Sequence, residues 1–287
     1  MTKKILIQFD IDTQPSSFDS VVAIDAGVDH LLRYEGVQVT NATGLIHGAM
    51  FTRGGEDLKN TAIFIGGSDV SAAEKLLVAC QKVFFGPVRV SLMLDANGCN
   101  TTASAAVVAA SRHIDLAGAK AVVLGGTGPV GRRVAQLLAS DGADVVVTSR
   151  TLSRAQSAAD EIRGKVSSGT LSAGQAGTPS QTAEVLASAQ IVIACGAAGV
   201  ELVSENTMKS LSTLKVAIDL NAVPPAGIEG IGVSDKAKSY GSGVGYGAIG
   251  VGGLKMKTHR QAIASLFDSN DKVLDAAEIY AIAKSIG

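Results

Sequence analysis

One stretch limits the folds open to this chain more than any other. Residues 121–150, AVVLGGTGPVGRRVAQLLASDGADVVVTSR, contain an apolar run, a glycine-rich turn, a helical pattern and a second apolar run. Short Val-rich runs on either side of an amphipathic stretch are typical of a strand, a helix and a second strand. The stretch therefore predicts a parallel α/β unit.

The turn in this stretch has the glycine spacing of a dinucleotide-binding site. In GTGPVG the first glycine allows a tight turn, the second lets a pyrophosphate approach the backbone, and the third allows close packing of helix on strand. A proline suits the first helical turn, where its missing N–H costs nothing. A glycine turn in an unliganded α/β domain is the alternative. The predicted cofactor-binding residues of the turn are Gly126, Thr127, Gly128, Pro129, Val130 and Gly131.

The end of the second apolar run indicates which dinucleotide is bound. A carboxylate about 20 residues after the motif would bind the ribose hydroxyls of NAD, but Ser149 and Arg150 stand there instead. Arg150 can pair with a 2′-phosphate through two hydrogen bonds, and Ser149 can donate a third. Arg154, one helical turn further on, either reinforces this pocket or is a solvated surface arginine. The pattern favours NADP.

Composition excludes several other classes of protein. The 287 residues are enough for two domains. A net charge of -1, from 25 basic and 26 acidic residues, gives no field that would recruit nucleic acid or an anionic membrane. Three separated cysteines and four histidines show no disulfide or metal-ligand spacing. Without a signal peptide or a membrane span, we expect a soluble, cytoplasmic protein.

Strand-like and helix-like runs alternate along the chain in two series. Strands are expected within 4–9, 61–67 and 88–94, and again within 121–126, 144–149, 190–196 and 215–221. A helix over 71–85 would begin with a capping box between Ser71 and Glu74. An Ala-rich helix over 100–114 would join two α/β units. Helices within 254–267 and 275–286, with no strand after them, would pack back on the first unit.

Two segments have the composition of linkers, 164–181 and 241–253. Disorder is one interpretation of the second, in which seven of thirteen residues are glycine. Its interleaved apolar residues favour backbone pressed against a ligand or another strand.

Polar and small residues at the predicted strand ends are candidates for ligand binding, because ligands of open α/β sheets lie over those ends. Gly196 and Ala197 would approach the nicotinamide. Asp219 and Asn221, after the next strand, are expected to bind substrate, and Asn221 also the cofactor. In the first unit, short polar groups could read the donors and acceptors of a heterocycle. These are Asp95, Asn97, Thr101 and Thr102, with Thr101 or Thr102 as a plain N-cap being the alternative. Asp19 is either another acid of this site or a first-turn carboxylate favoured by the helix dipole.

Blocks spread over nearly the whole chain carry a family resemblance. They include FDSVVAIDAGVDHL, TAIFIGGSD, MLDANGCNTTASAA, ACGAAGVEL, DLNAVPPAGIEGIG and GAIGVGGLKMKTHR. Together with GGTGPVGRR they resemble the methylene-tetrahydromethanopterin dehydrogenases of methylotrophic bacteria and their relatives. Such enzymes oxidise methylene-tetrahydromethanopterin with NADP in one-carbon metabolism, and some members also accept NAD or methylene-tetrahydrofolate.

The resemblance implies an α/β fold with two α/β domains around a cleft, the second a Rossmann-type dinucleotide-binding domain. A pterin domain would span 1–115, completed by 256–287, and the NADP domain would span 116–255. The resemblance also suggests a homotrimer and places the active-site lysine at Lys255, expected to bind the pterin carbonyl or to be neutral through burial. Lys257 is the rival, and two solvated lysines are the alternative.

The predicted function is hydride transfer between methylene-tetrahydromethanopterin and NADP+, giving the methenyl form. The reaction leaves a cation shared by two nitrogens, so it needs alignment and electrostatics more than a strong base. Two alternatives stay open: a methylene-tetrahydrofolate dehydrogenase of the same fold, and a non-catalytic NADP-binding redox sensor. The two tetrahydropterins are not distinguished by sequence.

Overall fold

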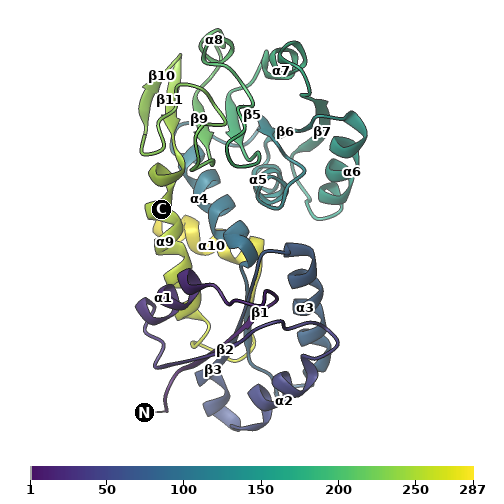
Figure 1. The fold of residues 1–287 in the computed structure, drawn as a ribbon, viewed down its shortest axis with the longest axis vertical. Helices are drawn as coiled ribbons and strands as arrows, with labels where there is room; N and C mark the ends of the chain where they lie inside the picture. The colour runs from purple at the N-terminus through teal and green to yellow at the C-terminus, as the bar shows by residue number, and fades with distance from the viewer. Residues whose placement is uncertain (1) are drawn as a thin grey trace. The chain divides into compact units, whose positions relative to one another are not determined.

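The computed structural model describes residues 2–287 and divides into two compact units. One unit runs to Thr101 and also contains Met256–Ile286, and the other is Thr102–Lys255. The division falls within two long helices, α4 (Cys99–Ser111) and α9 (Ala248–Ser265), as Figure 1 shows. Each unit has its own parallel sheet, which confirms the predicted fold class.

The sheet of the first unit has five strands in the order β12-β4-β3-β1-β2, all parallel. Every residue of β3 is buried, as expected for an inner strand of a parallel sheet covered on both faces. The strands are β1 (Ile5–Asp10), β2 (His30–Tyr34), β3 (Thr61–Gly66), β4 (Ser91–Leu94) and β12 (Val273–Leu274).

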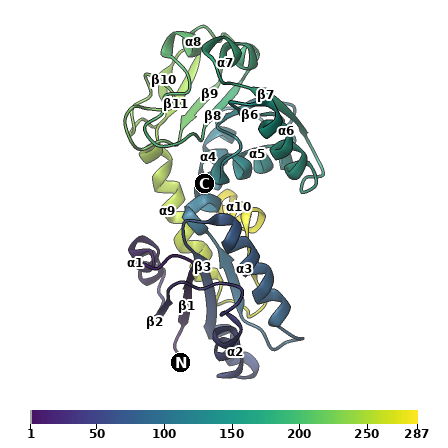
Figure 2. The ribbon, with the colours of Figure 1, turned by 45° about the vertical axis from the view of Figure 1, so that its right-hand side comes forward.

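Helices cover both faces of this sheet. One buried cluster joins Phe64 and Met93 of the sheet to Val22 of α1 (Ser17–Asp25), Ile263 of α9 and Ile279 of α10 (Ala276–Ile286). The helices α2 (Thr43–Phe51) and α3 (Val70–Val83) pack on β3 from the other side (Figure 2). A 3₁₀-helix, η1 (Gly55–Asn60), leads into β3.

Two local predictions for this unit are wrong. The N-cap of α3 is Asp69, whose carboxylate accepts a 3.0 Å hydrogen bond from the Ala72 N–H, so Ser71 and Glu74 do not form the predicted capping box. A strand does follow α9, because β12 pairs with β4 at Val273 and Leu92. Two residues are too few for a period of two to be recognised in the sequence.

The sheet of the second unit has the order β10-β11-β9-β8-β5-β6-β7. From β7 to β11 the order along the chain is 3-2-1-4-5-6, the Rossmann arrangement, and β10 adds an antiparallel edge. The strands are β5 (Lys120–Leu124), β6 (Asp144–Ser149), β7 (Thr170–Gln175), β8 (Ile191–Ala194), β9 (Val216–Asp219), β10 (Lys238–Tyr240) and β11 (Gly243–Tyr246).

Four helices connect these strands. Helix α5 (Pro129–Ser140) follows β5, and α6 (Leu152–Arg163) follows β6, and both pack on β6. Helices α7 (Pro179–Leu186) and α8 (Glu205–Lys209) follow β7 and β8, and their Leu186 and Met208 share a buried cluster with Val192 of β8. The turn between β5 and α5 therefore lies at the carboxyl end of β5, the central strand of this sheet.

The glycine-rich segments are ordered elements rather than linkers. The segment 164–181 contains β7 and the start of α7, and 241–253 contains β11 and the first turns of α9. A Cβ at Gly243 would lie 2.4 Å from the Lys215 carbonyl oxygen, and one at Gly247 would lie 2.2 Å from that of Gly232. These glycines allow close approach of backbone to backbone, the second of the two interpretations of this segment.

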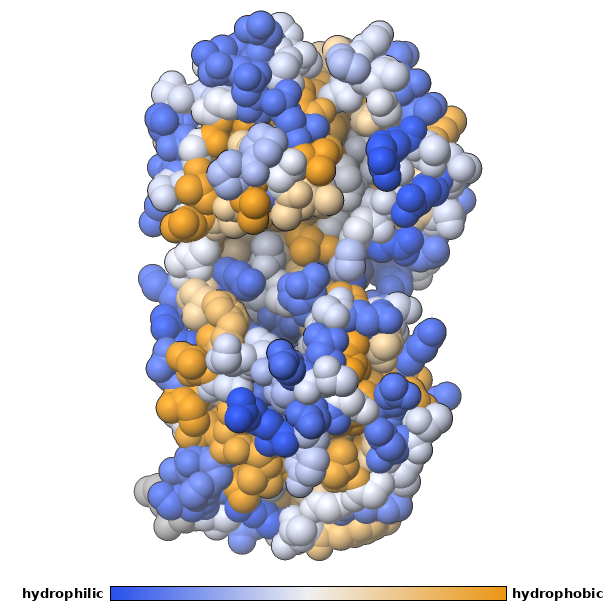
Figure 3. All heavy atoms as spheres, in the orientation of Figure 1, coloured by the Kyte–Doolittle hydropathy of each residue, from blue (hydrophilic) through white to orange (hydrophobic). Residues whose placement is uncertain are grey.

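The edge of the first sheet ends in an apolar surface. Figure 3 shows hydrophobic side chains gathered over α1 and β2, where Phe18, Val21 and Ile24 of the helix and Leu32 and Tyr34 of the strand are exposed. None of the helices within residues 2–287 is both long and apolar enough to cross a membrane.

Candidate functional site

The glycine-rich turn lies between β5 and α5, at the carboxyl end of the central strand. The Gly126 N–H donates a 3.0 Å hydrogen bond to the carbonyl of Thr148 on β6, which fixes the turn to the neighbouring strand. Helix α5 begins after Gly128, its N-cap, with Pro129 in its first turn as predicted. The first N–H groups of α5 therefore point out of the carboxyl edge of the sheet, where an anion can accept from them.

The three motif glycines serve different purposes. A Cβ at Gly131 would lie 2.7 Å from the Gly126 Cα, and one at Gly126 would lie 2.8 Å from a methyl of Val147. A Cβ at Gly128 would meet nothing closer than the Gly125 carbonyl oxygen at 3.8 Å. The packing of the chain thus requires glycine at 126 and 131 but not at 128. Open space at Gly128 is what a dinucleotide pyrophosphate needs, so these residues fit that group.

A glycine contact that the sequence did not reveal closes the turn from the other side. Gly125 has φ +68°, and a Cβ there would lie 2.8 Å from the Gly196 Cα. A Cβ at Gly196 would in turn lie 2.7 Å from the side chain of Leu202. Packing between the β5 and β8 turns therefore requires glycine at 125, while Gly196, predicted to approach the nicotinamide, contacts the Leu202 side chain. Its neighbour Ala197 is exposed.

A pocket of about 260 Å3 opens beside Arg150 at the end of β6. It is lined from the segment before and within α7, including Thr178, and from the segment between β8 and α8, including Glu201 and Leu202. Arg150 and Arg154 are exposed, and among residues 2–287 neither guanidinium has a hydrogen bond or ion pair. Ser149, the last residue of β6, is half-buried. The structure places Arg150 where it can reach a ligand in this pocket.

The polar residues after β9 hold their own loop. Asp219 is 1% exposed and its two carboxylate oxygens accept from the N–H groups of Asn221 at 3.0 Å and Ile228 at 3.1 Å. Burial raises its pKa, although backbone hydrogen bonds oppose the shift. The Asn221 side chain donates to the Pro225 carbonyl and accepts from the Val223 N–H. Both residues, predicted to bind substrate, are in contact with backbone of residues 221–228.

Cys195 lies between this loop and the glycine turn. Burial and, to a smaller extent, the Asp219 carboxylate raise the pKa of its thiol. A thiol with a raised pKa is a poor nucleophile, because the thiolate is the reactive form. Covalent catalysis through Cys195 is therefore disfavoured.

The predicted substrate residues after β4 separate into a buried pair and two accessible side chains. Asp95 and Thr101 are fully buried, with the carboxylate also accepting from the Asn100 N–H at 2.9 Å. Asn97, in the 3₁₀-helix η2 (Ala96–Gly98), is exposed and has φ +52°, and Thr102 is half-buried. Neither threonine is the N-cap of α4, because the helix already begins at Cys99; the Asp95 carboxylate accepts from the N–H groups of Asn100 and Thr101 in its first turn.

Asp19 lies in the first turn of α1, where its N–H donates to the Ser16 hydroxyl at 3.2 Å. Its carboxylate also lies at the carboxyl edge of the first sheet: Asp10 and Asp19 each have an oxygen 3.5 Å from the position of a Cβ at Gly66. Asp19 is thus both a first-turn carboxylate of α1 and an acid at the carboxyl edge of the first sheet. Asp10 is fully buried and binds the N–H groups of Asp12 and Ser16, so Asp19 is the more accessible acid.

Helix α9 orients the two candidate lysines differently. Both lysines lie within a helix that begins at Ala248, so a two-residue step turns their side chains to different faces. Lys255 is half-buried and Lys257 is exposed. One turn after Lys255, the fully buried ring of His259 stacks on Phe64 at 5.7 Å, and its Nδ1 lies 3.9 Å from Asp95 Oδ2. The His259 ring was not singled out in the sequence, and it fixes α9 beside the end of β4.

Sequence comparisons cover the whole chain. The bifunctional protein MdtA of Methylorubrum extorquens is 46% identical over 290 residues, which cover 100% of both chains. Residues 17–97 match the family described as methylene-tetrahydromethanopterin dehydrogenase, N-terminal. An NAD(P)-dependent methylenetetrahydromethanopterin dehydrogenase of the same organism is 31% identical and covers 94% of both chains. The chain belongs to the methylene-tetrahydromethanopterin dehydrogenase family.

Further comparisons concern the second unit and the fold. Residues 108–239 match the shikimate/quinate 5-dehydrogenase family. The quinate dehydrogenase of Corynebacterium glutamicum in complex with NAD has a TM-score of 0.57 at 16% identity, covering 99% of each chain. The shikimate dehydrogenase of Listeria monocytogenes has a TM-score of 0.55 at 14% identity, covering 98% of this chain and 96% of that one. At this identity the likeness concerns the fold. Membership of the methylene-tetrahydromethanopterin dehydrogenase family makes the chain a nicotinamide-dependent oxidoreductase.

Proposed function

We propose that this chain transfers a hydride from methylene-tetrahydromethanopterin to NADP+ and releases the methenyl form. The observation that carries the proposal is the turn at Gly128, where open space next to the first N–H groups of α5 fits a pyrophosphate in a chain matched from end to end by MdtA. Arg150 in place of an acidic residue supports NADP.

The chain contributes binding and alignment to this reaction. When bound, NADP+ supplies the hydride acceptor. Backbone N–H groups at the start of α5 hold the pyrophosphate, and Arg150 with Ser149 holds the 2′-phosphate. Backbone meets backbone where Gly125 contacts Gly196, at the carboxyl ends of β5 and β8, and we assign the nicotinamide to this edge of the sheet.

The pterin is assigned to polar groups at the carboxyl edge of the first sheet and at the start of α4. Asp19, Asn97 and Thr102 are the accessible members of the predicted set, and they offer acceptors and donors for a heterocycle. The buried hydrogen bond between Thr101 and Asp95 fixes the start of α4, next to Asn97 and Thr102. The division of the chain into a pterin domain over 1–115 with 256–287 and an NADP domain over 116–255 is part of this proposal.

Lys255 is the proposed catalytic residue. Loss of hydride leaves a cation shared by two nitrogens. The protein must therefore accommodate this positive charge, and the step needs no base to remove a proton. We assign Lys255 the task of binding the pterin carbonyl away from the reacting carbon, because it is the less exposed of the two lysines. Asp219 and Asn221 take a positioning role, since they hold residues 221–228.

The test is an NADP-reduction assay with purified protein and either methylene-tetrahydromethanopterin or methylene-tetrahydrofolate. NADPH formation with the first supports the proposal, and formation with the second alone supports the folate alternative. NADP binding without turnover of either supports the redox-sensor alternative. A homotrimer is also proposed, by family resemblance, and light scattering on the purified protein measures it.

A further inference from the structure

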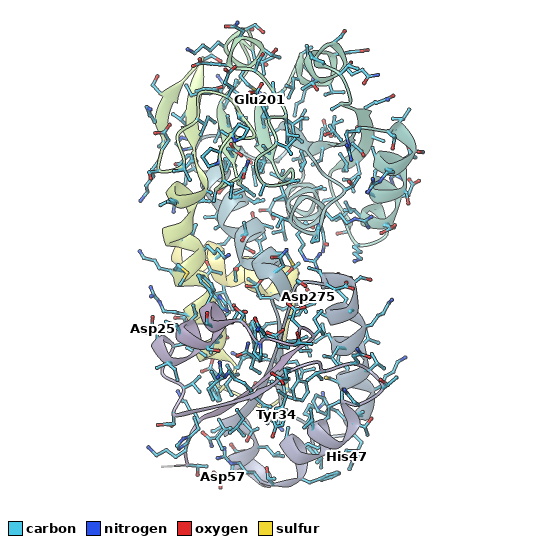
Figure 4. All side chains as sticks on the ribbon, viewed as in Figure 1. Asp25, Tyr34, His47, Asp57, Glu201 and Asp275 are labelled. Atoms are coloured by element: carbon cyan, nitrogen blue, oxygen red, sulfur yellow. The ribbon has the colours of Figure 1, made fainter. Side chains whose placement is uncertain are left out.

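The pocket beside Arg150 contains a second charge that the dinucleotide motif does not explain. Glu201 lies on the segment between β8 and α8 (Figure 4) and lines the same 260 Å3 space as Arg150. Among the described residues that line it, these two are the ionisable ones. Each side chain is exposed, and within residues 2–287 the Glu201 carboxylate has neither a hydrogen bond nor an ion pair. The pocket thus presents one free cation and one free anion to whatever it binds.

The remaining walls suit an adenosine. Ala176, Pro179 and Leu202 give apolar surface, and Thr178 and Ser204 give hydroxyl groups. The volume is below that of a pocket for a whole drug-sized ligand, as expected for a subsite that takes one part of a dinucleotide. A 2′-phosphate carries close to two negative charges at neutral pH, so it is attracted by Arg150 and repelled by Glu201. A ribose 2′-hydroxyl or an adenine amino group has no such conflict and can donate to a carboxylate.

We propose that Glu201 sets the balance between NADP and NAD by opposing Arg150 in this pocket. The inference rests on the proposed function, which makes this pocket the adenosine end of the dinucleotide site. Arg150 alone would give a strong preference for NADP, and the carboxylate of Glu201 reduces it by repelling the 2′-phosphate while accepting a hydrogen bond from either cofactor. Neither role requires contact between the two side chains.

The experiment measures dissociation constants of NADP+ and NAD+ by titration calorimetry for three proteins: wild type, Glu201→Gln and Glu184→Gln. Glu184 is an exposed residue of α7 that does not line the pocket, so its substitution changes the net charge equally. We expect Glu201→Gln to raise the NADP+ preference, as a ratio of the two constants, about threefold to tenfold at low salt. The gain should shrink at high salt, because screening weakens the repulsion. Glu184→Gln should leave the ratio unchanged.

The outcomes separate this inference from the proposed function. An unchanged ratio in Glu201→Gln, or an equal rise in Glu184→Gln, overturns the assignment of Glu201 while NADP+ binding to the wild type stands. A rise in the ratio that is the same at low and high salt also overturns it, because repulsion between charges must be screened. If the wild type binds neither cofactor, the proposed function itself fails.

Discussion

The Thr101 hydroxyl donates a 2.6 Å hydrogen bond to Oδ2 of Asp95, and neither side chain is exposed to solvent. Removing the hydroxyl would leave a buried carboxylate with one donor fewer, which costs about 1–3 kcal/mol. We expect Thr101→Val to lower the free energy of unfolding by that amount in urea denaturation and to leave the NADP+ dissociation constant unchanged. A variant of wild-type stability with weakened pterin binding would show instead that Thr101 contacts the substrate.

Substitution of one motif glycine should lower stability, and substitution of another should weaken NADP+ binding. Gly131→Ala places a methyl group 2.7 Å from the Gly126 Cα and should destabilise the chain by about 1–3 kcal/mol. A methyl group at Gly128→Ala meets only the carbonyl oxygens of Gly125 at 3.8 Å and Cys195 at 4.0 Å, so stability should hold while NADP+ binding weakens about tenfold or more. Thermal unfolding and calorimetric titration of both variants check this pair. Normal NADP+ affinity in Gly128→Ala would mean that the pyrophosphate does not pass this residue.

Arg150→Glu should weaken NADP+ more than NAD+. The change removes a charge-assisted phosphate contact worth roughly 1.5–3 kcal/mol and adds repulsion. Titration of both cofactors measures it, with Arg163→Glu unsuitable as a control because Arg163 bonds the Leu171 carbonyl. Lys165→Glu, a charge reversal of an exposed residue beyond α6, is the better control. An NADP+ preference equal to that of the wild type would remove Arg150 from the site.

Two single substitutions in α9 test the catalytic lysine. Lys255→Met should cut turnover and leave NADP+ affinity nearly intact, because the loss falls on the transition state. Lys257→Met should be mild, since a two-residue step turns a helical side chain by about 200° and Lys257 is exposed. Steady-state kinetics decides between them. Severe loss at Lys257 with normal turnover at Lys255 would reverse the assignment.

His113 gives the second unit a pH-dependent stability. Its Nε2 lies 2.8 Å from the Tyr246 hydroxyl, and burial, with a smaller effect of Arg112, lowers its pKa below the ordinary 6.5. Below about pH 6.5 the unfolded chain binds this proton more readily than the folded chain does. The stability that neutral His113 contributes is therefore complete above about pH 6.5 and is lost as pH falls through the folded pKa. Urea midpoints of wild type and His113→Gln from about pH 5 to 8 measure the effect. Parallel curves for the two proteins would exclude His113.

Sequence reasoning found the dinucleotide turn because its signals are local. Glycine spacing, helix periodicity and the charge at the end of β6 all lie within 121–150 and depend on few distant contacts. The beginning of α9 was missed because glycine has low helix propensity, and tertiary packing overrides that propensity at Gly250, whose Cβ would lie 1.9 Å from the Asp235 carbonyl oxygen. The Rossmann-type fold of the second unit was predicted and is confirmed, whereas β12 and the Asp69 cap were not foreseen.

Burial of individual polar residues could not be read from the sequence. Asp95 and Asn97 stand two positions apart after the same strand, yet one is fully buried and the other is exposed. The buried ring of His259, which lies far along the chain, is 3.9 Å from Asp95, and such a contact between distant segments cannot be read from the residues around 95. Glu201 was missed for a similar reason, because no fixed spacing joins it to Arg150 and only the fold brings both to one pocket.

Hydride transfer to NADP+ is measured by following the absorbance of NADPH when purified protein is mixed with NADP+ and methylene-tetrahydromethanopterin. We expect the wild type to form NADPH, Lys255→Met to form little or none, Arg150→Glu to form less, and Lys257→Met to stay close to the wild type. Absence of NADPH formation by wild-type protein that binds NADP+ would contradict the proposed function.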